Sequence, residues 1–253
     1  MFQIERVEKI LEYINRKKKA NVKELSEQFE VSKVTIRRDL DELAEKGLVV
    51  KTHGGVMSIM NKFAYEIPIA SKFEANSEAK KKIGALAASL IEEGDIVVFD
   101  AGSTTLEIAK SMKTQDITVL TNDIKISMEV AMKPNVKLMV SGGALSDSVY
   151  TLVGDQTVEF FKKVHVNKTF LGCDAIDLEF GISNRTREEV PAKKAMIDAA
   201  EEVIMVTDDS KHNTKVFCYL CEISRINKLI TNRIDDRFRL ELEKIGVEVL
   251  IAE

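Results

Sequence analysis

Residues 100–105, Asp-Ala-Gly-Ser-Thr-Thr, combine the residue types that bind an anion. They follow an apolar segment at 95–99 and lead directly into a segment with a helical pattern. Glycine lets the backbone approach a ligand closely, and hydroxyls together with the N–H groups at a helix start donate hydrogen bonds to it. We therefore expect an anion such as a phosphate to bind here. The candidate binding residues are Asp100, Gly102, Ser103, Thr104 and Thr105.

Four further polar runs follow apolar segments in the same way. They are Thr121-Asn122-Asp123, Ser141-Gly142-Gly143, Gly172-Cys173-Asp174-Ala175-Ile176-Asp177 and Asp208-Asp209-Ser210-Lys211. Each run alone is as typical of helix capping as of ligand binding. Because ligands bind outside the carboxyl ends of parallel strands, five such runs at one sheet edge, one of them with a lysine, favour a ligand site. The pattern predicts a phosphorylated or polyhydroxylated small molecule, with simple helix capping as the alternative.

The segments that would position these runs alternate between helical and strand patterns from Ser77 to the C-terminus. Helices are expected near 77–91, 105–112, 124–132, 155–163, 188–200 and 235–245. Strands are expected near 95–99, 117–120, 136–140, 167–171, 203–207, 228–231 and 247–251. Repeated strand–helix units of this length predict a Rossmann-like α/β domain, in which helices cover both faces of a mostly parallel sheet.

A second set of side chains, within residues 21–55, suits contact with DNA. The pattern predicts a helix, a tight turn, a second helix and a short basic hairpin. Asn21 and Glu24 have the spacing of a capping box at the first helix, and Ser32 stands where a cap for the second belongs. Two short helices with the basic one second are the geometry that places a helix N-terminus in the major groove. The candidate DNA-binding residues are Ser32, Lys33, Thr35, Arg37, Arg38, Lys51 and His53.

The charges of the second helix run against the helix dipole. Arg37 and Arg38 stand near its start. The acidic residues that follow are Asp39, Asp41, Glu42 and Glu45. A helix that serves only stability has acids in its first turn and bases in its last. The reversed order is expected if DNA phosphates and base edges lie against the helix start, although a basic face is often merely solvated. A strand at 48–52 and a turn at 53–55 would add a wing.

Residues 32–40 read Ser-Lys-Val-Thr-Ile-Arg-Arg-Asp-Leu, and residues 47–55 read Gly-Leu-Val-Val-Lys-Thr-His-Gly-Gly. This sequence resembles the DNA-binding heads of the DeoR family of bacterial transcription regulators, which have S-x-x-T-I-R-R-D-L followed by G-L-[IV]-x-[RK]-x-H-G-G. The match is ungapped and departs visibly only at Val50-Lys51, where a second basic residue is common. The resemblance implies a winged helix-turn-helix domain that binds double-stranded operator DNA, in a repressor of a sugar-metabolism operon.

From about residue 75 to the C-terminus the chain resembles the effector domain of the same family, which is similar to ribose-5-phosphate isomerases. The matching segments are D-A-G-S-T-T at 100–105, T-N at 121–122, G-G at 142–143, F-L-G-C-D-A-I-D at 170–177 and D-D-S-K at 208–211. The resemblance implies a phosphorylated sugar as effector, with its phosphate on Ser103, Thr104 and Thr105 and with Lys211 near the anion. By the same resemblance Asp174, Asp177 and Glu189 would face the sugar. Thr121, Asn122, Gly142 and Gly143 complete the candidate effector site.

The isomerases follow their two-aspartate segment with a lysine and a glycine run, whereas residues 178–182 here are Leu-Glu-Phe-Gly-Ile. Ala175 also replaces a glycine that is usual in the family. A proton-transfer enzyme needs an electrophile opposite its base, and none is evident from the sequence. We therefore expect binding without catalysis, and no catalytic residues. One alternative is a sugar-phosphate isomerase that carries a DNA-binding head, and another is a nucleic-acid-binding protein without effector control, whose C-terminal domain only forms oligomers.

The charge of the chain differs between its two ends. Residues 1–57 hold 12 basic and 10 acidic residues, a charge of +2, and the remainder holds 25 and 31, a charge of −6. We expect a winged helix-turn-helix domain at 1–57, a linker at 58–75, and an effector-binding and oligomerisation domain at 76–253. One DNA-binding head covers too little DNA for tight operator binding, so a homo-oligomer, dimer or tetramer, is expected.

No run of about 18 apolar residues occurs, and the N-terminus lacks the apolar core of a signal peptide. Three cysteines fit a reducing compartment, so the sequence predicts a cytoplasmic protein with no membrane partner. Cys218 and Cys221 form a lone C-x-x-C without a second pair, so no metal site and no cofactor are expected.

Overall fold

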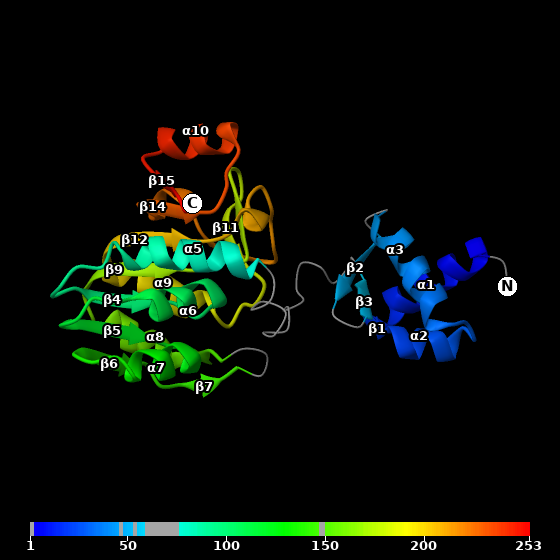
Figure 1. Ribbon diagram of the computed structural model, residues 1–253, viewed down its shortest axis with the longest axis horizontal. Helices are drawn as coiled ribbons and strands as arrows, with labels where there is room; N and C mark the ends of the chain where they lie inside the picture. The colour runs from blue at the N-terminus through cyan, green and yellow to red at the C-terminus, as the bar shows by residue number, and fades with distance from the viewer. Residues whose placement is uncertain (1–2, 46–47, 53–54, 59–75, 147–149) are drawn as a thin grey trace. The chain divides into compact units, whose positions relative to one another are not determined.

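The computed structural model describes residues 3–45, 48–52, 55–58, 76–146 and 150–253 (Figure 1). The chain divides into two compact units, Met1–Tyr65 and Glu66–Glu253. His53 and residues 59–75, nearly all of the predicted linker, lie outside the described residues. Within the described ranges, no helix is long and apolar enough to cross a membrane.

The first unit consists of helices and a small antiparallel sheet. Its helices are α1 (Gln3–Lys17), α2 (Val22–Gln28) and α3 (Lys33–Glu45). Its strands are β1 (Lys19–Asn21), β2 (Val49–Thr52) and β3 (Gly55–Ser58), in the order β1–β3–β2. The α2–α3 pair and the β2–β3 hairpin confirm the predicted winged helix-turn-helix. Strand β1 was not predicted, because three residues with one apolar side chain show no alternation.

Local hydrogen bonds fix the start of both helices of the helix-turn-helix. The Asn21 side chain accepts from the Glu24 N–H at 2.8 Å, and the Glu24 carboxylate accepts from the Asn21 N–H at 3.4 Å, which confirms the capping box. Ser32 Oγ accepts from the Thr35 N–H at 3.2 Å and so caps α3. Between the helices, Glu30 has a φ of 53°, and this left-handed conformation turns the chain.

The apolar stripe of α3 faces the core of the first unit, as predicted. Ile36, Leu40 and Leu43 are almost completely buried and pack in one cluster with Leu25 of α2 and Ile10 of α1. Burial of each such side chain contributes about 1.5–3 kcal/mol. The opposite face of α3 is thereby directed to solvent.

A seven-stranded parallel sheet forms the second unit (Figure 1). In order across the sheet its strands are β15 (Glu248–Ile251), β14 (Lys228–Thr231), β12 (Ala200–Val206), β9 (Val166–Leu171), β4 (Ile96–Phe99), β5 (Ile117–Thr121) and β6 (Val136–Val140). Helices α5 (Ser77–Ala88), α6 (Ser103–Ser111) and α7 (Ile124–Ala131) cover one face. Helices α8 (Asp155–Lys162), α9 (Val190–Ala199) and α10 (Asp236–Lys244) cover the other.

Alternate residues of β4 show that both faces of the sheet are packed. Val97 and Phe99 lie in the core beneath α5, α6 and α7, whereas Val98 lies in the core beneath α8, α9 and α10. This arrangement confirms the predicted Rossmann-like α/β domain. Each of the predicted helices and strands of this unit is present, with boundaries that differ from the prediction by a few residues at most.

Two smaller pieces of sheet were not predicted. One contains β10 (Ala175–Asp177), β11 (Gly181–Asn184) and β13 (Cys218–Cys221), and the other is the hairpin of β7 (Ala144–Leu145) and β8 (Leu152–Val153). Gly181 has a φ of 82°, and a Cβ there would lie 2.5 Å from the Cys221 carbonyl oxygen, so this turn requires glycine. Strands this short give almost no periodicity in the sequence.

Candidate functional site

The loop after β4 leads into α6 at the carboxyl edge of the sheet. Gly102 precedes the helix, and no described side chain caps it. The Thr105 hydroxyl instead donates to the Gly102 carbonyl at 2.9 Å. Because the first N–H groups of a helix have no partner within it, the backbone of Ser103 and Thr104 offers donors to an anion.

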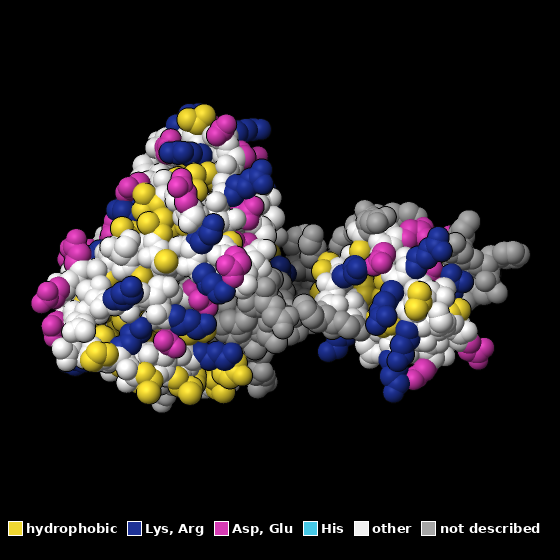
Figure 2. Space-filling model, viewed as in Figure 1, with side chains coloured by type: hydrophobic (Ala, Val, Ile, Leu, Met, Phe, Trp, Pro, Cys, Tyr) yellow, Lys and Arg dark blue, Asp and Glu magenta, His cyan; other side chains and the backbone are white. Residues whose placement is uncertain are grey.

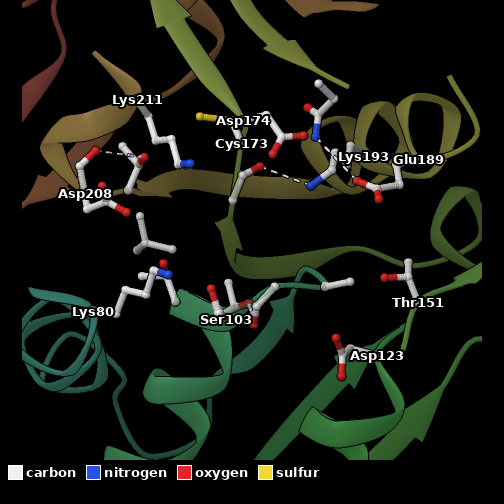
Figure 3. A pocket seen from close by; sticks show the side chains of 18 of the residues that line it. Lys80, Ser103, Asp123, Thr151, Cys173, Asp174, Glu189, Lys193, Asp208 and Lys211 are labelled. Carbon is white, nitrogen blue, oxygen red and sulfur yellow. Dashed lines mark hydrogen bonds between the residues drawn. The ribbon is translucent and has the colours of Figure 1, made fainter. Parts of the chain in front are cut away.

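A cavity of about 130 Å³ lies beside this helix start (Figure 3). Ser103 lines it together with Lys80 of α5 and Lys211 at the end of the short 3-10 helix η2 (Asp209–Lys211). Lys80 is only 6% exposed, so its charge is held close to the cavity. One carboxylate, Asp208, lies on the same side (Figure 3), and the two ammonium groups and the helix N-terminus together make this end of the cavity attractive to an anion.

The opposite end of the cavity is lined by carboxylates (Figure 3). Asp174 follows β9, Glu189 immediately precedes α9, and Asp123 precedes α7. Asp174 accepts from the Arg185 backbone N–H at 3.0 Å, and Arg185 Nε lies 3.9 Å from the same carboxylate. Carboxylates accept hydrogen bonds, so this end suits the hydroxyl groups of a ligand.

Lys193 of α9 reaches the same cavity from within the protein. It is 3% exposed and forms an ion pair with Asp100, which is 1% exposed. The Lys193 amine also donates to the Gly172 carbonyl at 3.1 Å, and Asp100 accepts from the Gly172 N–H at 2.9 Å. Burial alone would lower the pKa of Lys193, but Asp100 and Glu189 outweigh it and raise that pKa above its usual value. The pair thus joins the loops after β4 and β9 to α9.

Asp123 has a shifted pKa at the carboxylate end. Its Oδ1 accepts from the Ile126 N–H at 2.9 Å and caps α7. Burial raises the pKa of Asp123 to about 6, against the lowering effect of its backbone hydrogen bonds, and the charge of Asp100 adds to the rise. The pKa of Asp123 is higher in the folded than in the unfolded state. Its favourable contribution to the free energy of unfolding is therefore complete below pH 4 and is lost as the pH rises through about 6.

We expect Asp123→Asn to stabilise the protein at pH 8 by about 1–3 kcal/mol and to leave its stability nearly unchanged at pH 3, where the carboxyl group is protonated in both the folded and the unfolded state. Asparagine retains the oxygen that caps α7 and removes only the desolvated charge. Urea unfolding at the two pH values measures the difference. An equal effect of the substitution at both pH values would contradict the raised pKa.

The cavity brings together a large part of the predicted effector site. The predicted residues that line it are Gly102, Ser103, Thr104, Thr105, Asp174, Glu189 and Lys211. Asp100 lies behind this lining, buried against Lys193. The other predicted residues are placed differently.

Thr121, Asn122, Gly142 and Gly143 do not line the cavity. The Thr121 hydroxyl donates to the Phe99 carbonyl at 2.7 Å, and the Asn122 amide donates to the Leu152 carbonyl at 3.0 Å. The Gly142 carbonyl accepts from Thr157 at 2.8 Å, and a Cβ on Gly143 would lie 2.5 Å from the Thr157 hydroxyl. In the structure these four residues hold the loops together, and their contact with an effector stays a prediction.

Asp177 is also not among the residues that line the cavity, and its contact with the sugar stays a prediction. It ends β10, accepts from the Phe180 and Glu179 N–H groups at 2.8 and 3.0 Å, and pairs with Lys215 at 3.2 Å. The short strand β10, which begins directly after Asp174, pairs with β11 in a sheet separate from the parallel one. The sequence did not predict this strand, and the family resemblance alone had assigned the two aspartates to the sugar.

Sequence reasoning missed several cavity residues, above all Lys193, Lys80, Asp123, Asn184 and Thr151. Both lysines stand within helical segments rich in charge, where lysine is ordinarily solvated. No electrophile opposite the carboxylates was evident from the sequence, and Lys193, which lines the same cavity, comes from a helix remote in sequence. The apolar residues around Lys193, among them the buried Ala192, Ala195 and Met196, could have indicated that this lysine is buried.

The second candidate site is the exposed face of α3. Lys33, Arg37 and Arg38 are exposed there, and the first turn of α3 contains no acidic residue. Figure 2 shows Lys and Arg side chains gathered on the visible face of this unit. Thr35 is half-buried and its hydroxyl pairs with that of Ser32 at 2.9 Å. Basic side chains beside an acid-free helix start suit phosphate and base contacts.

Two of the acids on α3 have structural partners. Asp39 is 1% exposed and receives two hydrogen bonds from the Arg6 guanidinium, at 2.6 and 3.0 Å, which tie α1 to α3. Asp41 pairs with Lys51 of the wing at 2.6 Å, with both side chains exposed. The reversed charge order of α3 therefore has a partial explanation in packing, and it indicates DNA less strongly than the sequence suggested.

Two family models match the chain, the DeoR-like helix-turn-helix domain over residues 6–62 and the DeoR C terminal sensor domain over residues 75–233. The HTH-type transcriptional repressor GlcR of Bacillus subtilis is 33% identical over 255 residues, which cover 100% of this chain and 98% of GlcR. The L-fucose operon activator of Haemophilus influenzae is 32% identical over 232 residues, which cover 90% of this chain and 91% of the activator.

Among solved structures, the ribose 5-phosphate isomerase of Methanocaldococcus jannaschii covers 55% of this chain and 55% of its own, with a TM-score of 0.40 and 16% identity. This likeness concerns the fold alone. The family models, by contrast, cover most of the chain, and the relatives align over nearly their whole length. The chain therefore belongs to the DeoR family of helix-turn-helix transcriptional regulators.

Proposed function

We propose that this regulator binds operator DNA through α3 and the wing, and that a phosphorylated sugar in the cavity of the sensor domain controls this binding. One observation supports the proposal most strongly: the open N-terminus of α6, Lys80 and Lys211 meet at one end of a cavity whose other end is lined by carboxylates. A phosphate fits the first end, and sugar hydroxyls fit the second.

We propose that the regulator represses a sugar-metabolism operon. GlcR is named a repressor, whereas the relative from Haemophilus influenzae is named an activator. The sugar phosphate must bind the DNA-competent and DNA-incompetent states unequally, because a ligand shifts an equilibrium only by its differential affinity. A reporter gene behind the operator distinguishes repression from activation.

We propose that the cavity binds without turnover. Glu189 and Lys193 line the same cavity, the one observation that favours the isomerase alternative. The Lys193 amine, however, already donates to Asp100 and to the Gly172 carbonyl, which is a structural pairing. Incubation of the protein with pentose and hexose phosphates, followed by product analysis, separates a regulator from an enzyme: interconversion of any aldose and ketose phosphate would establish the alternative.

We further propose a cytoplasmic homo-oligomer that needs neither metal nor cofactor. One DNA-binding head per chain supports assembly, since two heads on repeated half-sites supply the affinity that one lacks. The three cysteines are free thiols, consistent with a reducing compartment. Sedimentation of the full chain with and without operator DNA tests the assembly, which a persistent monomer would contradict.

Lys211→Ala should weaken binding of the effector by about 1.5–3 kcal/mol, because it removes a charge-assisted contact with the phosphate. Operator affinity in the absence of effector should stay within a few-fold of wild type. Lys215→Ala is the matched control, since Lys215 pairs with Asp177 outside the cavity. Thermal shift with a panel of phosphorylated sugars identifies a ligand, and calorimetry then measures its affinity for each variant. Equal affinities of the two variants would refute the phosphate role of Lys211.

A further inference from the structure

We propose that Val34 of α3 contacts the C5-methyl group of a thymine in the operator and thereby contributes to sequence specificity. This inference rests on the proposed function, because it requires that α3 lies against the operator. It deepens that function by naming the base group that one side chain recognises. Its basis is an exposed apolar side chain on the same face of α3 as the basic residues.

Val34 is 73% exposed in the first turn of α3. Leu48, at 38%, is the other exposed large apolar residue among the described residues of the first unit. An exposed valine gains little from burial, and valine favours a helix less than alanine does. The stability of the first unit therefore gives no reason for a valine at this position.

The direction of Val34 around the helix axis excludes a contact with the core. Successive residues of a helix are rotated by about 100°, so Val34 lies about 160° from Ile36 and opposite the buried stripe. Arg38, one turn further along, lies within about 40° of Val34. In agreement, the apolar cluster of the first unit, as far as the structure describes it, does not include Val34.

Basic side chains flank Val34 on this face of α3. Lys33, Arg37 and Arg38 are all exposed, and the first turn of the helix contains no acidic residue. Contacts of such cations with phosphates position a recognition helix, and contacts with base edges supply its specificity. A helix held in the major groove by these cations would bring the methyl groups of Val34 to the base edges.

The neighbouring hydroxyl groups of this turn already have partners. Ser32 Oγ accepts from the Thr35 N–H at 3.2 Å, and the Ser32 and Thr35 hydroxyls form a hydrogen bond of 2.9 Å with each other. Val34, between them in the chain, offers only its two methyl groups to a base. Among the four bases only thymine presents a methyl group in the major groove, and contact between methyl groups removes apolar surface from water. Thymine is therefore the base that fits Val34.

The test uses an operator selected from random duplex DNA with the full-length chain. Each thymine of the operator is then replaced in turn by deoxyuridine, which pairs with adenine in the same way and lacks the methyl group. Fluorescence anisotropy measures the affinity of the chain for each duplex. For wild type, we expect at least one replacement to weaken binding about three- to fivefold, the effect of exposing one methyl group.

Val34→Ala assigns this methyl group to its partner in the protein. The variant should bind the unmodified operator about three- to tenfold more weakly, and the same deoxyuridine replacement should then change its affinity by less than about 1.5-fold. Thermal unfolding of the variant should match wild type, because alanine favours a helix more than valine does. Leu240→Ala is the matched control, since Leu240 is 56% exposed on α10 of the sensor domain, and it should keep the wild-type response to deoxyuridine.

Three results would overturn the inference. They are a selected operator without thymine, a wild-type affinity that no deoxyuridine replacement lowers, and a response to deoxyuridine that is unchanged in Val34→Ala. The proposed function survives each of them if Arg37→Ala and Arg38→Ala still weaken operator binding. If both arginine variants instead bind the operator as wild type does, α3 does not read the operator, and the proposed function fails together with the inference.

Discussion

Lys193→Met should lower the free energy of unfolding of the sensor domain by about 3–5 kcal/mol, the usual cost of removing one partner from a buried ion pair. The substitution leaves Asp100 charged in the interior at 1% exposure. Asp100 also accepts from the Gly172 N–H, so the loops that follow β4 and β9 lose a common anchor. Methionine has a similar volume, and the loss is therefore electrostatic rather than a packing defect.

Lys194→Met is the matched control, because Lys194 is the next residue of α9 and is exposed. We expect its effect on urea unfolding to stay within about 0.5 kcal/mol. Adding Asp100→Asn to Lys193→Met should recover part of the lost stability, since the unpaired charge is then removed. Equal stability of the Lys193 and Lys194 variants would show that the buried pair contributes nothing.

The largest effect on DNA binding is expected from Arg37 and Arg38. Replacement of each by alanine should weaken operator binding by about 1–3 kcal/mol, or roughly 5- to 150-fold, if its side chain reaches a base edge. Both side chains are exposed on the first half of α3, whose apolar face holds the helix in the core. Neither substitution removes a buried contact, so the fold of the first unit should be unaffected.

Titration of labelled operator DNA with each variant measures the loss, and circular dichroism verifies the fold. Arg225→Ala is the matched control, because Arg225 is an exposed arginine of the sensor domain that pairs with Asp198. Wild-type operator affinity in both α3 variants would mean that another element reads the operator.

The sequence predicted best what short-range patterns determine. The capping box of Asn21 and Glu24 and the buried stripe of Ile36, Leu40 and Leu43 depend on residues a few positions apart. The parallel sheet could be predicted because helical and strand patterns of apolar residues alternate along the chain. Each strand and helix is long enough to show its own pattern. The polar loops at strand ends then placed Ser103 and its neighbours at one edge.

What the sequence could not show depends on tertiary contacts. Lys193 looks like a solvated helix lysine until α9 is packed against the loops that hold Asp100 and Gly172. The family resemblance grouped Asp177 with Asp174, but Asp177 ends the unpredicted strand β10 and pairs with Lys215. The buried partner of Asp39 is Arg6, 33 residues earlier, and no local pattern connects the two.

The measurement that tests the central claim most directly is operator release by the full chain. Operator-bound protein is titrated with phosphorylated sugars and with the same sugars lacking phosphate, for wild type and for Lys211→Ala. The account predicts that at least one sugar phosphate changes operator affinity and that its unphosphorylated parent does not. Lys211→Ala should require about 10- to 150-fold more of the phosphate. An equal response to phosphate and parent sugar, or an unaltered response of Lys211→Ala, would contradict control by a phosphate bound in the cavity.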